Sequence, residues 1–273
     1  MRKINFNKMV ASGNDFIVVD QDESKAIFCK RRVQSLANAL CDRKYGIGAD
    51  GLLLLEKSKK ADIRMRIFNA DGTEANMCGN GARCAALYSS LDSRNKFINI
   101  ETKAGIIESR VQKNSVKIKL TDPKYFKLDI PLRINGMPLR VNFVDTGVPH
   151  AVIFVSGIDR IDVNGIGRIV RFHNKFAPAG ANVNFVEVLG GKLIRVRTYE
   201  RGVEAETLAC GTGSVASALI LAAKHLGVDL NNVNVMTQGK ELLKVYFDKF
   251  NGIFKNVWLE GKAGVVYKGE YYV

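Results

Sequence analysis

The sequence predicts an α/β (α+β) protein of two similar halves, each with a curved, mainly antiparallel sheet around one buried helix. The first observation is a duplicated motif, Glu74-Ala-Asn-Met-Cys-Gly-Asn-Gly and Glu206-Thr-Leu-Ala-Cys-Gly-Thr-Gly. The second is an apolar segment rich in Ala and Leu that follows each copy. The third is a set of short segments in which apolar and polar residues alternate, as in half-buried strands. Together these observations indicate duplication.

The individual elements follow from the periods of the apolar residues. Strands are expected around 63–67, 116–120 and 193–199, where apolar residues recur at every second position. Helical spacing is found at 33–41, and again at 82–91 and 215–226, directly after the two motifs. Because these last two segments are apolar on all sides, each is expected to be buried inside its own half.

A second repeat supports the duplication and helps to divide the chain. Gly13 and Gly147 each precede an extended apolar run. The strongest breaks in the pattern are Asp122-Pro123 and the segment 135–138, Asn-Gly-Met-Pro. We expect an N-terminal half, residues 1–122, that carries Cys78, and a C-terminal half, residues 123–261, that carries Cys210. The extended stretch 262–273 is expected to return to the first half.

Composition favours a soluble globular chain in a reducing compartment. The 273 residues are 47% hydrophobic and 25% charged, as in soluble globular proteins. The sequence contains no long uncharged apolar run and no apolar signal core, so we expect a cytoplasmic location and no membrane partner. Five cysteines, an odd number in a chain of this size, indicate free thiols rather than a disulfide framework.

The formal net charge of +14 leaves one function of a different class open. A basic surface attracts nucleic acid. The charges are spread along the chain, however, and the short run Lys57-Ser-Lys-Lys60 has no interleaved aromatic residue. We therefore expect a solvated lysine-rich surface and no nucleic-acid partner, and a steep salt dependence of DNA or RNA binding would distinguish the alternative.

The chemistry is concentrated in the two Cys-Gly-x-Gly sequences. A helix begins with unpaired N–H groups and partial positive charge, which favour a thiolate and can hold a carboxylate. Glycine lets the backbone approach a ligand closely. Two such helix starts that converge on one substrate would place its α-carbon between two sulfurs. A thiolate on one face and a thiol on the other can then invert that carbon, so Cys78 and Cys210 are predicted to be catalytic.

The alternative interpretation is that both cysteines are small buried hydrophobic residues, the usual state of a free cysteine. We expect this of Cys29, Cys41 and Cys84, which have no comparable setting. Zinc binding is not indicated, because the sequence has no Cys-x-x-Cys and its three histidines are scattered.

Segments from the first strand to beyond Cys210 resemble the diaminopimelate epimerase family. They are Gly13-Asn-Asp-Phe-Ile-Val-Val-Asp20, Asp42-Arg-Lys-Tyr-Gly-Ile-Gly-Ala-Asp50, the signature segments 68–84 and 199–213, and Gly147-Val-Pro-His150. The resemblance implies two pseudo-symmetric halves, each a sheet around a central helix. It also implies a cofactor-independent interconversion of LL- and meso-2,6-diaminopimelate in the pathway to lysine and peptidoglycan.

The resemblance assigns roles to residues of this chain. It implies that Cys210 accepts the proton from the LL isomer, that Cys78 donates one, and that His150 and Glu200 tune the thiol pKa values. Substrate binding is implied for Asn14, Asn69, Gly79, Asn80, Asn182, Glu200, Arg201, Gly211 and Thr212. No metal and no cofactor are implied, and the partner is a small-molecule substrate, with a homodimer possible.

This chain departs from the family pattern at a few positions. Val148 stands where many members have Asn, Gly51 replaces a polar residue, and the segment 203–206 is one residue longer than the common form. A proline racemase-like enzyme of the same fold is the near alternative. It is disfavoured because Asn80 follows Cys78-Gly79 where that group typically has His.

Overall fold

The computed structural model describes residues 3–21, 33–91, 93, 95–134, 136–224 and 230–272. The chain forms two compact units. Unit 1 comprises Met1–Ile118 and Gly261–Val273, and unit 2 comprises Lys119–Glu260. The two halves expected from the sequence, residues 1–122 and 123–261, stay a prediction. Their limits differ by a few residues from the boundaries of the two units.

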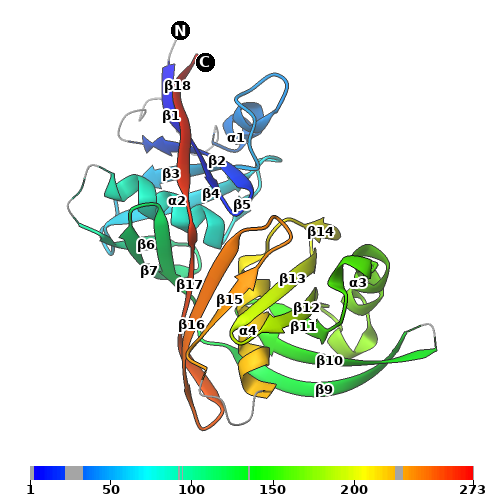
Figure 1. Ribbon diagram of the computed structural model, residues 1–273. Coiled ribbons are helices and arrows are strands. Elements are labelled where there is room, and N and C mark those ends of the chain that lie inside the picture. The colour runs from blue at the N-terminus through cyan, green and yellow to red at the C-terminus, as the bar shows by residue number, and fades with distance from the viewer. Residues whose placement is uncertain are drawn as a thin grey trace. The chain divides into compact units, whose positions relative to one another are not determined.

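Unit 1 is a mixed sheet with two helices (Figure 1, blue to green, with β18 in red). Its elements are β1 (Lys3–Ala11), β2 (Asn14–Asp20), α1 (Val33–Cys41), β3 (Gly51–Glu56), β4 (Ile63–Asn69), β5 (Glu74–Ala75), α2 (Gly79–Ser90), β6 (Phe97–Thr102), β7 (Gly105–Gln112), β8 (Ser115–Lys119) and β18 (Gly264–Tyr272). The strands pair in the order β18–β1–β2–β3–β4–β6–β7–β8, and β5 also pairs with β4. Only β2–β3 and β4–β6 are parallel among these pairs.

Unit 2 repeats this order strand for strand. Its elements are β9 (Lys124–Ile134), β10 (Met137–Asp145), β11 (Pro149–Phe154), the 3-10 helix η2 (Ile158–Arg160), α3 (Val163–Arg171), the 3-10 helix η3 (Asn174–Phe176), β12 (Asn182–Gly190), β13 (Leu193–Glu200), β14 (Ala205–Thr207), α4 (Gly211–Lys224), β15 (Asn232–Met236), β16 (Leu242–Phe250) and β17 (Ile253–Lys262). The order is β9–β10–β11–β12–β13–β15–β16–β17, with β14 on β13 and the parallel pairs at β11–β12 and β13–β15. The predicted fold of two pseudo-symmetric halves is confirmed.

Each unit encloses one helix, as the apolar segments predicted. The helix α2 contacts strands β1–β4, β6, β7 and β18, and α4 contacts β10–β13, β15 and β16. In α4 every residue from Gly213 to Ala222 is buried. A helix that is covered on all sides has no solvent-exposed polar face, so small and apolar residues predominate in both helices, and buried polar side chains such as Arg83 and Ser217 form internal hydrogen bonds.

A second helix in each unit makes the crossover that a parallel strand pair requires. The helix α1 packs on β3 and β4, and α3 packs on β12, β13 and β14. The predicted helix at 33–41 is confirmed, whereas α3 was missed. Asp162 caps this helix by accepting from Gly165 N, and Val163, Gly167 and Val170 form its buried face, but Gly165 and Gly167 lower the helix propensity of the segment.

The expected break between halves at 135–138 is wrong. Ile134 pairs with Met137 in the antiparallel β9–β10 hairpin, inside unit 2. An Asn-Gly turn between two strands indicates a hairpin as readily as a domain boundary.

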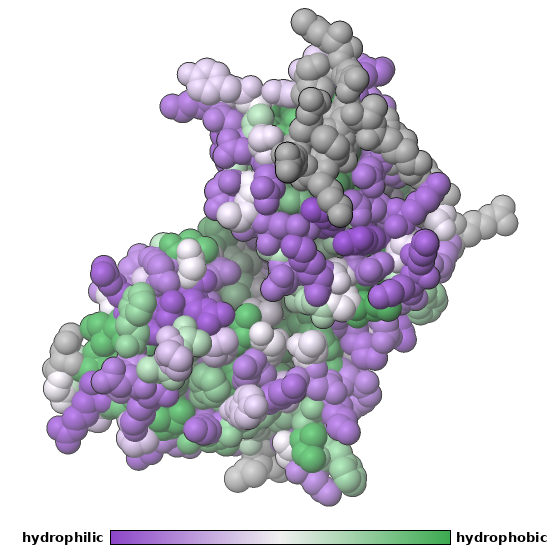
Figure 2. Space-filling model, turned by 180° about the vertical axis from the view of Figure 1, so that it is seen from behind, coloured by the Kyte–Doolittle hydropathy of each residue, from purple (hydrophilic) through white to green (hydrophobic). Residues whose placement is uncertain are grey.

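The surface is polar, and within the part of the chain that the structure describes no helix is both long and apolar enough to cross a membrane. On the face in Figure 2, hydrophilic side chains predominate and hydrophobic residues lie in small groups among them. This agrees with the dispersed charges of the sequence.

An ion pair at equivalent places in the two units fixes the strand that leads to each cysteine. Arg66 Nε lies 2.8 Å from Glu74 Oε1, and Arg197 Nε lies 2.7 Å from Glu206 Oε1, with a second N–H···O bond in each pair. In both units the glutamate lies four residues before the cysteine. The hydrogen bonds from Arg66, the largest influence, lower the pKa of Glu74 to about 2.

We predict that Arg197→Met lowers the free energy of unfolding by roughly 1–3 kcal/mol, the range for hydrogen bonds to a charged group. Arg66→Met should cost less, because Lys103 Nζ also lies 2.8 Å from Glu74 and keeps that carboxylate paired. Urea unfolding of the two variants provides the comparison. Equal losses would contradict the proposed role of Lys103.

Candidate active site

Cys78 is the N-cap of the central helix of unit 1. The helix α2 begins at Gly79, and Cys78 Sγ accepts from Gly81 N at 3.5 Å. The cysteine is partly exposed, in contrast to the helix that follows it. The expected position of this thiol at a helix start is confirmed.

Cys210 has the equivalent place in unit 2. It directly precedes α4, its Sγ lies 3.5 Å from Thr212 Oγ1, and its carbonyl accepts from Ser214 N at 2.9 Å. Cys210 is about 9% exposed. A hydroxyl within reach of one sulfur distinguishes this helix start from the first, where Asn80 occupies the equivalent position.

The second glycine of each motif is closely packed, tightly at Gly81 and without room for a Cβ at Gly213. A Cβ at Gly81 would lie 3.1 Å from Leu53 Cδ2, and one at Gly213 would lie 2.3 Å from Asn184 Oδ1. The first turn of each central helix is therefore pressed against its own sheet. This packing gives a structural reason for the glycine in addition to the expected approach of a ligand.

Two predicted substrate-binding residues of unit 1 meet beside Cys78. Asn80 Nδ2 donates to Asn14 Oδ1 at 2.5 Å, and Asn14 Nδ2 donates to Asp50 Oδ2 at 3.1 Å. The fully buried Arg83 donates to Asn80 Oδ1 at 2.7 Å. Arg83 only donates, and Asp50 only accepts when ionised. The amides of Asn80 and Asn14 therefore each accept on the side of Arg83 and donate on the side of Asp50.

An ionic cluster that sequence reasoning missed supports this chain of hydrogen bonds. Arg43 binds Asp15 and Asp50 at 2.8 Å, and the nearly buried Lys8 lies 2.9 Å from Asp15. Burial raises the pKa of Asp15, but hydrogen bonds from Arg43 and Lys8 outweigh it and hold that pKa well below its usual range. Asp15 and Asp50 occur in the quoted family segments, but their sequence spacing did not indicate this contact.

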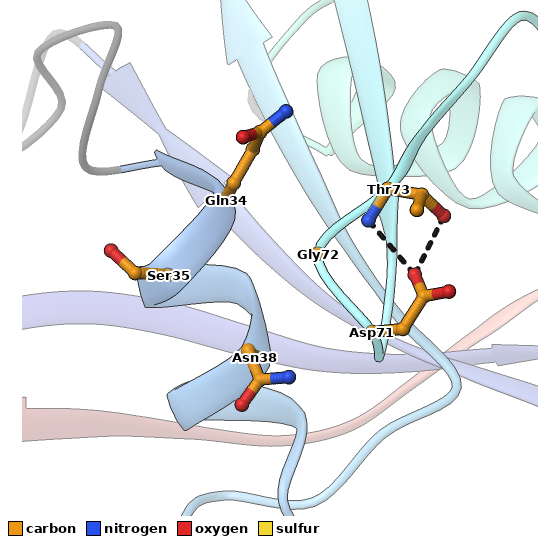
Figure 3. Close-up of a pocket in the computed structure, with 6 residues that line it drawn as sticks. All are labelled: Gln34, Ser35, Asn38, Asp71, Gly72 and Thr73. Atoms are coloured by element: carbon orange, nitrogen blue, oxygen red, sulfur yellow. Dashed lines mark hydrogen bonds between the residues drawn. The ribbon is translucent and has the colours of Figure 1, made fainter.

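Asn69 lies at the end of β4 and opens a tight turn. Its Nδ2 donates to Thr73 Oγ1 at 2.9 Å, and Asp71 accepts from Thr73 N and Oγ1. A polar pocket of about 380 Å³ lies between this turn and α1, lined by Gln34, Ser35, Asn38, Asp71, Gly72 and Thr73 (Figure 3). None of the predicted site residues lines that pocket.

Four predicted residues of unit 2 gather at one end of three adjacent strands. His150 on β11 is paired in register with Asn182 on β12. Asn182 Oδ1 accepts from Arg201 N at 2.8 Å, which places Arg201 directly after β13. Glu200 ends that strand, and burial raises its pKa. The structure thus brings His150, Asn182, Glu200 and Arg201 together.

His150 is fully buried and uncharged at neutral pH. Burial is the larger influence and the charge of Arg201 the smaller; together they lower the pKa of His150 to about 3. Its Nδ1 lies 3.1 Å from Asn184 Nδ2. The ring is therefore a buried core side chain with a hydrogen bond at Nδ1, and it lies beside the other predicted residues of unit 2.

The departures from the family pattern at Gly51 and at 203–206 have local explanations. A Cβ at Gly51 would lie 2.8 Å from Phe68 O, so β3 approaches β4 too closely for a side chain there. In the longer segment after Arg201, Glu204 has a positive φ of 57° and accepts from Gly202 N at 3.0 Å. The extra residue is absorbed in this turn. Nothing in the structure explains Val148.

The other described cysteines are core residues. Cys41 and Cys84 are buried, as expected, and burial raises their pKa values to about 11 and about 12. Cys29 lies outside the described residues. The described part of the chain contains no group of three or more potential metal-ligating side chains.

The low pKa of His150 predicts a defined sensitivity to acid. Between about pH 6.5 and about pH 3 the unfolded chain binds a proton that the folded state does not. Stability should be retained above pH 6.5 and fall by up to about 1.4 kcal/mol per pH unit below it. His150→Phe should remove this contribution. Urea unfolding of both proteins across this range tests the prediction, and parallel pH profiles would contradict it.

Comparisons with known proteins show the family of this chain. The sequence profile of the family described as "Diaminopimelate epimerase" matches residues 6–126 and 142–255. A diaminopimelate epimerase from Methanocella arvoryzae is 43% identical over 99% of this chain and 97% of its own length. One from Aquifex aeolicus is 40% identical over 97% of this chain and 96% of its own length.

Solved structures with low identity share the fold. A PhzF-family phenazine biosynthesis protein from Bacillus anthracis superposes with a TM-score of 0.75 at 21% identity and 100% coverage of both chains. A hydroxyproline epimerase from Agrobacterium vitis gives a TM-score of 0.69 at 14% identity, covering 99% of this chain and 91% of its own. From the profile and the full-length relatives, this chain belongs to the diaminopimelate epimerase family.

Proposed function

We propose that this chain is a diaminopimelate epimerase, an isomerase of lysine and peptidoglycan precursor biosynthesis that interconverts LL- and meso-2,6-diaminopimelate without a cofactor. The observation that carries the proposal is the repeated placement of a cysteine at the start of an enclosed helix in two units of the same topology. Relatives about 40% identical over nearly the whole chain bear this name.

In the proposed mechanism the two helix starts hold the reacting carboxylate through N–H groups of Gly79, Asn80, Gly211 and Thr212. These groups have no partner inside the helix and carry its positive end. From the LL isomer, the Cys210 thiolate removes the α-proton. The Cys78 thiol then delivers its proton to the opposite face of the carbanion. The carbon is inverted and the two sulfurs have exchanged protonation states, so the reverse reaction begins from that form.

The distal end of the substrate would be recognised by Arg201 and the polar residues that we expect around it. A guanidinium can bind the distal carboxylate with two hydrogen bonds, and Glu200, Asn14, Asn69 and Asn182 offer groups for the ammoniums. Supporting this, Asn182 Oδ1 already accepts from Arg201 N. His150 and Glu200 would tune the thiols through their buried positions.

The alternatives have weaker support. The proline racemase reading rests on structures of about 15% identity or less, which share the fold alone. Nucleic-acid binding rests only on net charge. A homodimer stays a prediction.

The first test removes each thiol. Cys78→Ala and Cys210→Ala should each lower interconversion by roughly 10²–10⁴-fold, the contribution of a positioned acid or base. Cys84→Ala is the matched control, because Cys84 lies in α2 but is fully buried, and it should retain activity. Exchange of the α-hydrogen of LL-diaminopimelate in heavy water is the measurement. Near-normal turnover by either catalytic variant would contradict the two-thiol mechanism.

The second test concerns the distal carboxylate. Arg201→Met should weaken catalysis with diaminopimelate by about 2–5 kcal/mol in kcat/KM, as for a charge pair that loses one partner. Any trace reaction with lysine, which lacks that carboxylate, should barely change. Arg195→Met is the control, because Arg195 lies on β13 but pairs with the exposed Asp159. Equal losses for both substrates would mean that Arg201 is structural.

A further inference from the structure

Three buried positions have opposite chemistry in the two units. The strand registers Phe16–Gly51 and His150–Asn182 make Phe16 equivalent to His150. In the same registers Leu53 is equivalent to Asn184, and their cross-strand partners Ile67 and Thr198 are equivalent to each other. Unit 1 has Phe, Leu and Ile at these positions, and unit 2 has His, Asn and Thr.

The fold does not require the polar version. All six side chains are at most 4% exposed, so each set is in the interior of its unit. The apolar set builds the same three strands around the same kind of helix start. Burying hydrogen-bonding groups gives no stability over apolar groups of similar shape, and leaves a large penalty wherever a partner is lost. The polar set in unit 2 therefore calls for a functional reason.

Hydrogen bonds around Asn184 determine which nitrogen of His150 carries the proton. Asn184 Nδ2 donates to Ala151 O at 3.1 Å, and Thr198 Oγ1 donates to Asn184 Oδ1 at 2.9 Å. Because Ala151 O only accepts, Asn184 must turn its Nδ2 toward this carbonyl. The same Nδ2 faces His150 Nδ1 at 3.1 Å. An amide nitrogen only donates. His150 Nδ1 therefore accepts, and the neutral ring carries its proton on Nε2.

The other ring nitrogen has no internal partner. His150 Nε2 is buried and forms no hydrogen bond with any of the described residues. A buried N–H without an acceptor costs about 1–3 kcal/mol, which a fold can avoid by placing Phe there, as unit 1 does. An N–H group that is kept at this cost is suited to donate to an acceptor that is present only during the reaction.

Asn184 also contacts the helix start that carries Cys210. Asn184 Oδ1 lies 2.3 Å from the position that a Cβ on Gly213 would take. His150 pairs across the strands with Asn182, which holds Arg201. One fully buried amide thus joins the first turn of α4 to the strand ends where the predicted distal-binding residues gather.

We propose that Asn184, supported by Thr198, is a positioning residue that holds His150 in its Nε2–H tautomer, so that the ring offers a donor to an anionic group of the reaction. The identity of that reaction rests on the proposed function. The anionic groups of the proposed reaction are a substrate carboxylate and a cysteine thiolate. An acceptor at Nε2 would repel both.

The tautomer can be measured directly and without any assay of activity. Long-range ¹⁵N–¹H spectra at neutral pH of the histidine-labelled protein contain three imidazoles, and the His150 signals are those lost in His150→Phe. The wild type should show a protonated Nε2 and an unprotonated Nδ1. In Asn184→Asp, of nearly equal size, the carboxylate has no hydrogen to give, so Nδ1 should become protonated.

Activity separates positioning from mere structure. Asn184→Asp should lower kcat for epimerisation roughly 10-fold, about the rate effect of losing one net hydrogen bond. Ser217→Ala, the control, removes another buried hydroxyl of unit 2, which donates to Gly213 O at 2.7 Å, and should keep the Nε2–H tautomer and most of kcat. An unchanged tautomer in Asn184→Asp, or a changed tautomer with full kcat, would overturn the proposal.

A variant that copies unit 1 guards against a loss of folding. The triple change His150→Phe, Asn184→Leu and Thr198→Ile should keep Tm at or above the wild-type value but lose most of kcat. Retained kcat would overturn the proposal. If the wild type shows the Nε2–H tautomer but does not epimerise diaminopimelate, the proposed function fails while the tautomer assignment stands.

Discussion

Only the N-terminal end of an α-helix has backbone N–H groups without a partner in the helix, and this constraint organises both units. The sides of α2 and α4 are buried against strands of their own units. Their first N–H groups have no partner within the helix. Cys78 and Cys210 lie at these ends, where the unpaired donors and the positive end of the helix dipole act on a sulfur and on any carboxylate beside it. The rest of each unit keeps that helix start in place.

Two kinds of contact hold the helix start. Gly81 and Gly213 let the first turn press on the sheet, where any larger residue would meet Leu53 or Asn184. The Arg–Glu pairs, Arg66 with Glu74 and Arg197 with Glu206, fix the strand that leads into each motif. Both contacts occur in both units, so they belong to the duplicated framework.

The side chains around the two helix starts differ. Unit 1 surrounds Cys78 with the chain of hydrogen bonds from Arg83 through Asn80 and Asn14 to Asp50. Unit 2 has Val215, Thr212, Val148 and Ala181 at these four positions, and places its polar groups at His150, Asn182 and Asn184. A symmetric frame with unlike flanks is suited to the proposed reaction, in which two thiols act on one carbon of a substrate held by its distal end.

By itself the sequence determined the fold class, the duplication, the enclosed helices and the positions of Cys78 and Cys210 at helix starts. These depend on local periodicity and on a repeated motif, which are written along the chain. Most of the implied binding residues came only from the family resemblance, because an isolated Asn or Arg has no local signature. The sequence did not predict α3, in which Gly165 and Gly167 lower the helix propensity, and it mistook the β9–β10 turn for a boundary. Only the tertiary structure decided which polar groups meet: the Lys8–Asp15–Arg43–Asp50 cluster and the tautomer of His150 depend on strand register and burial, which bring together residues far apart in the chain.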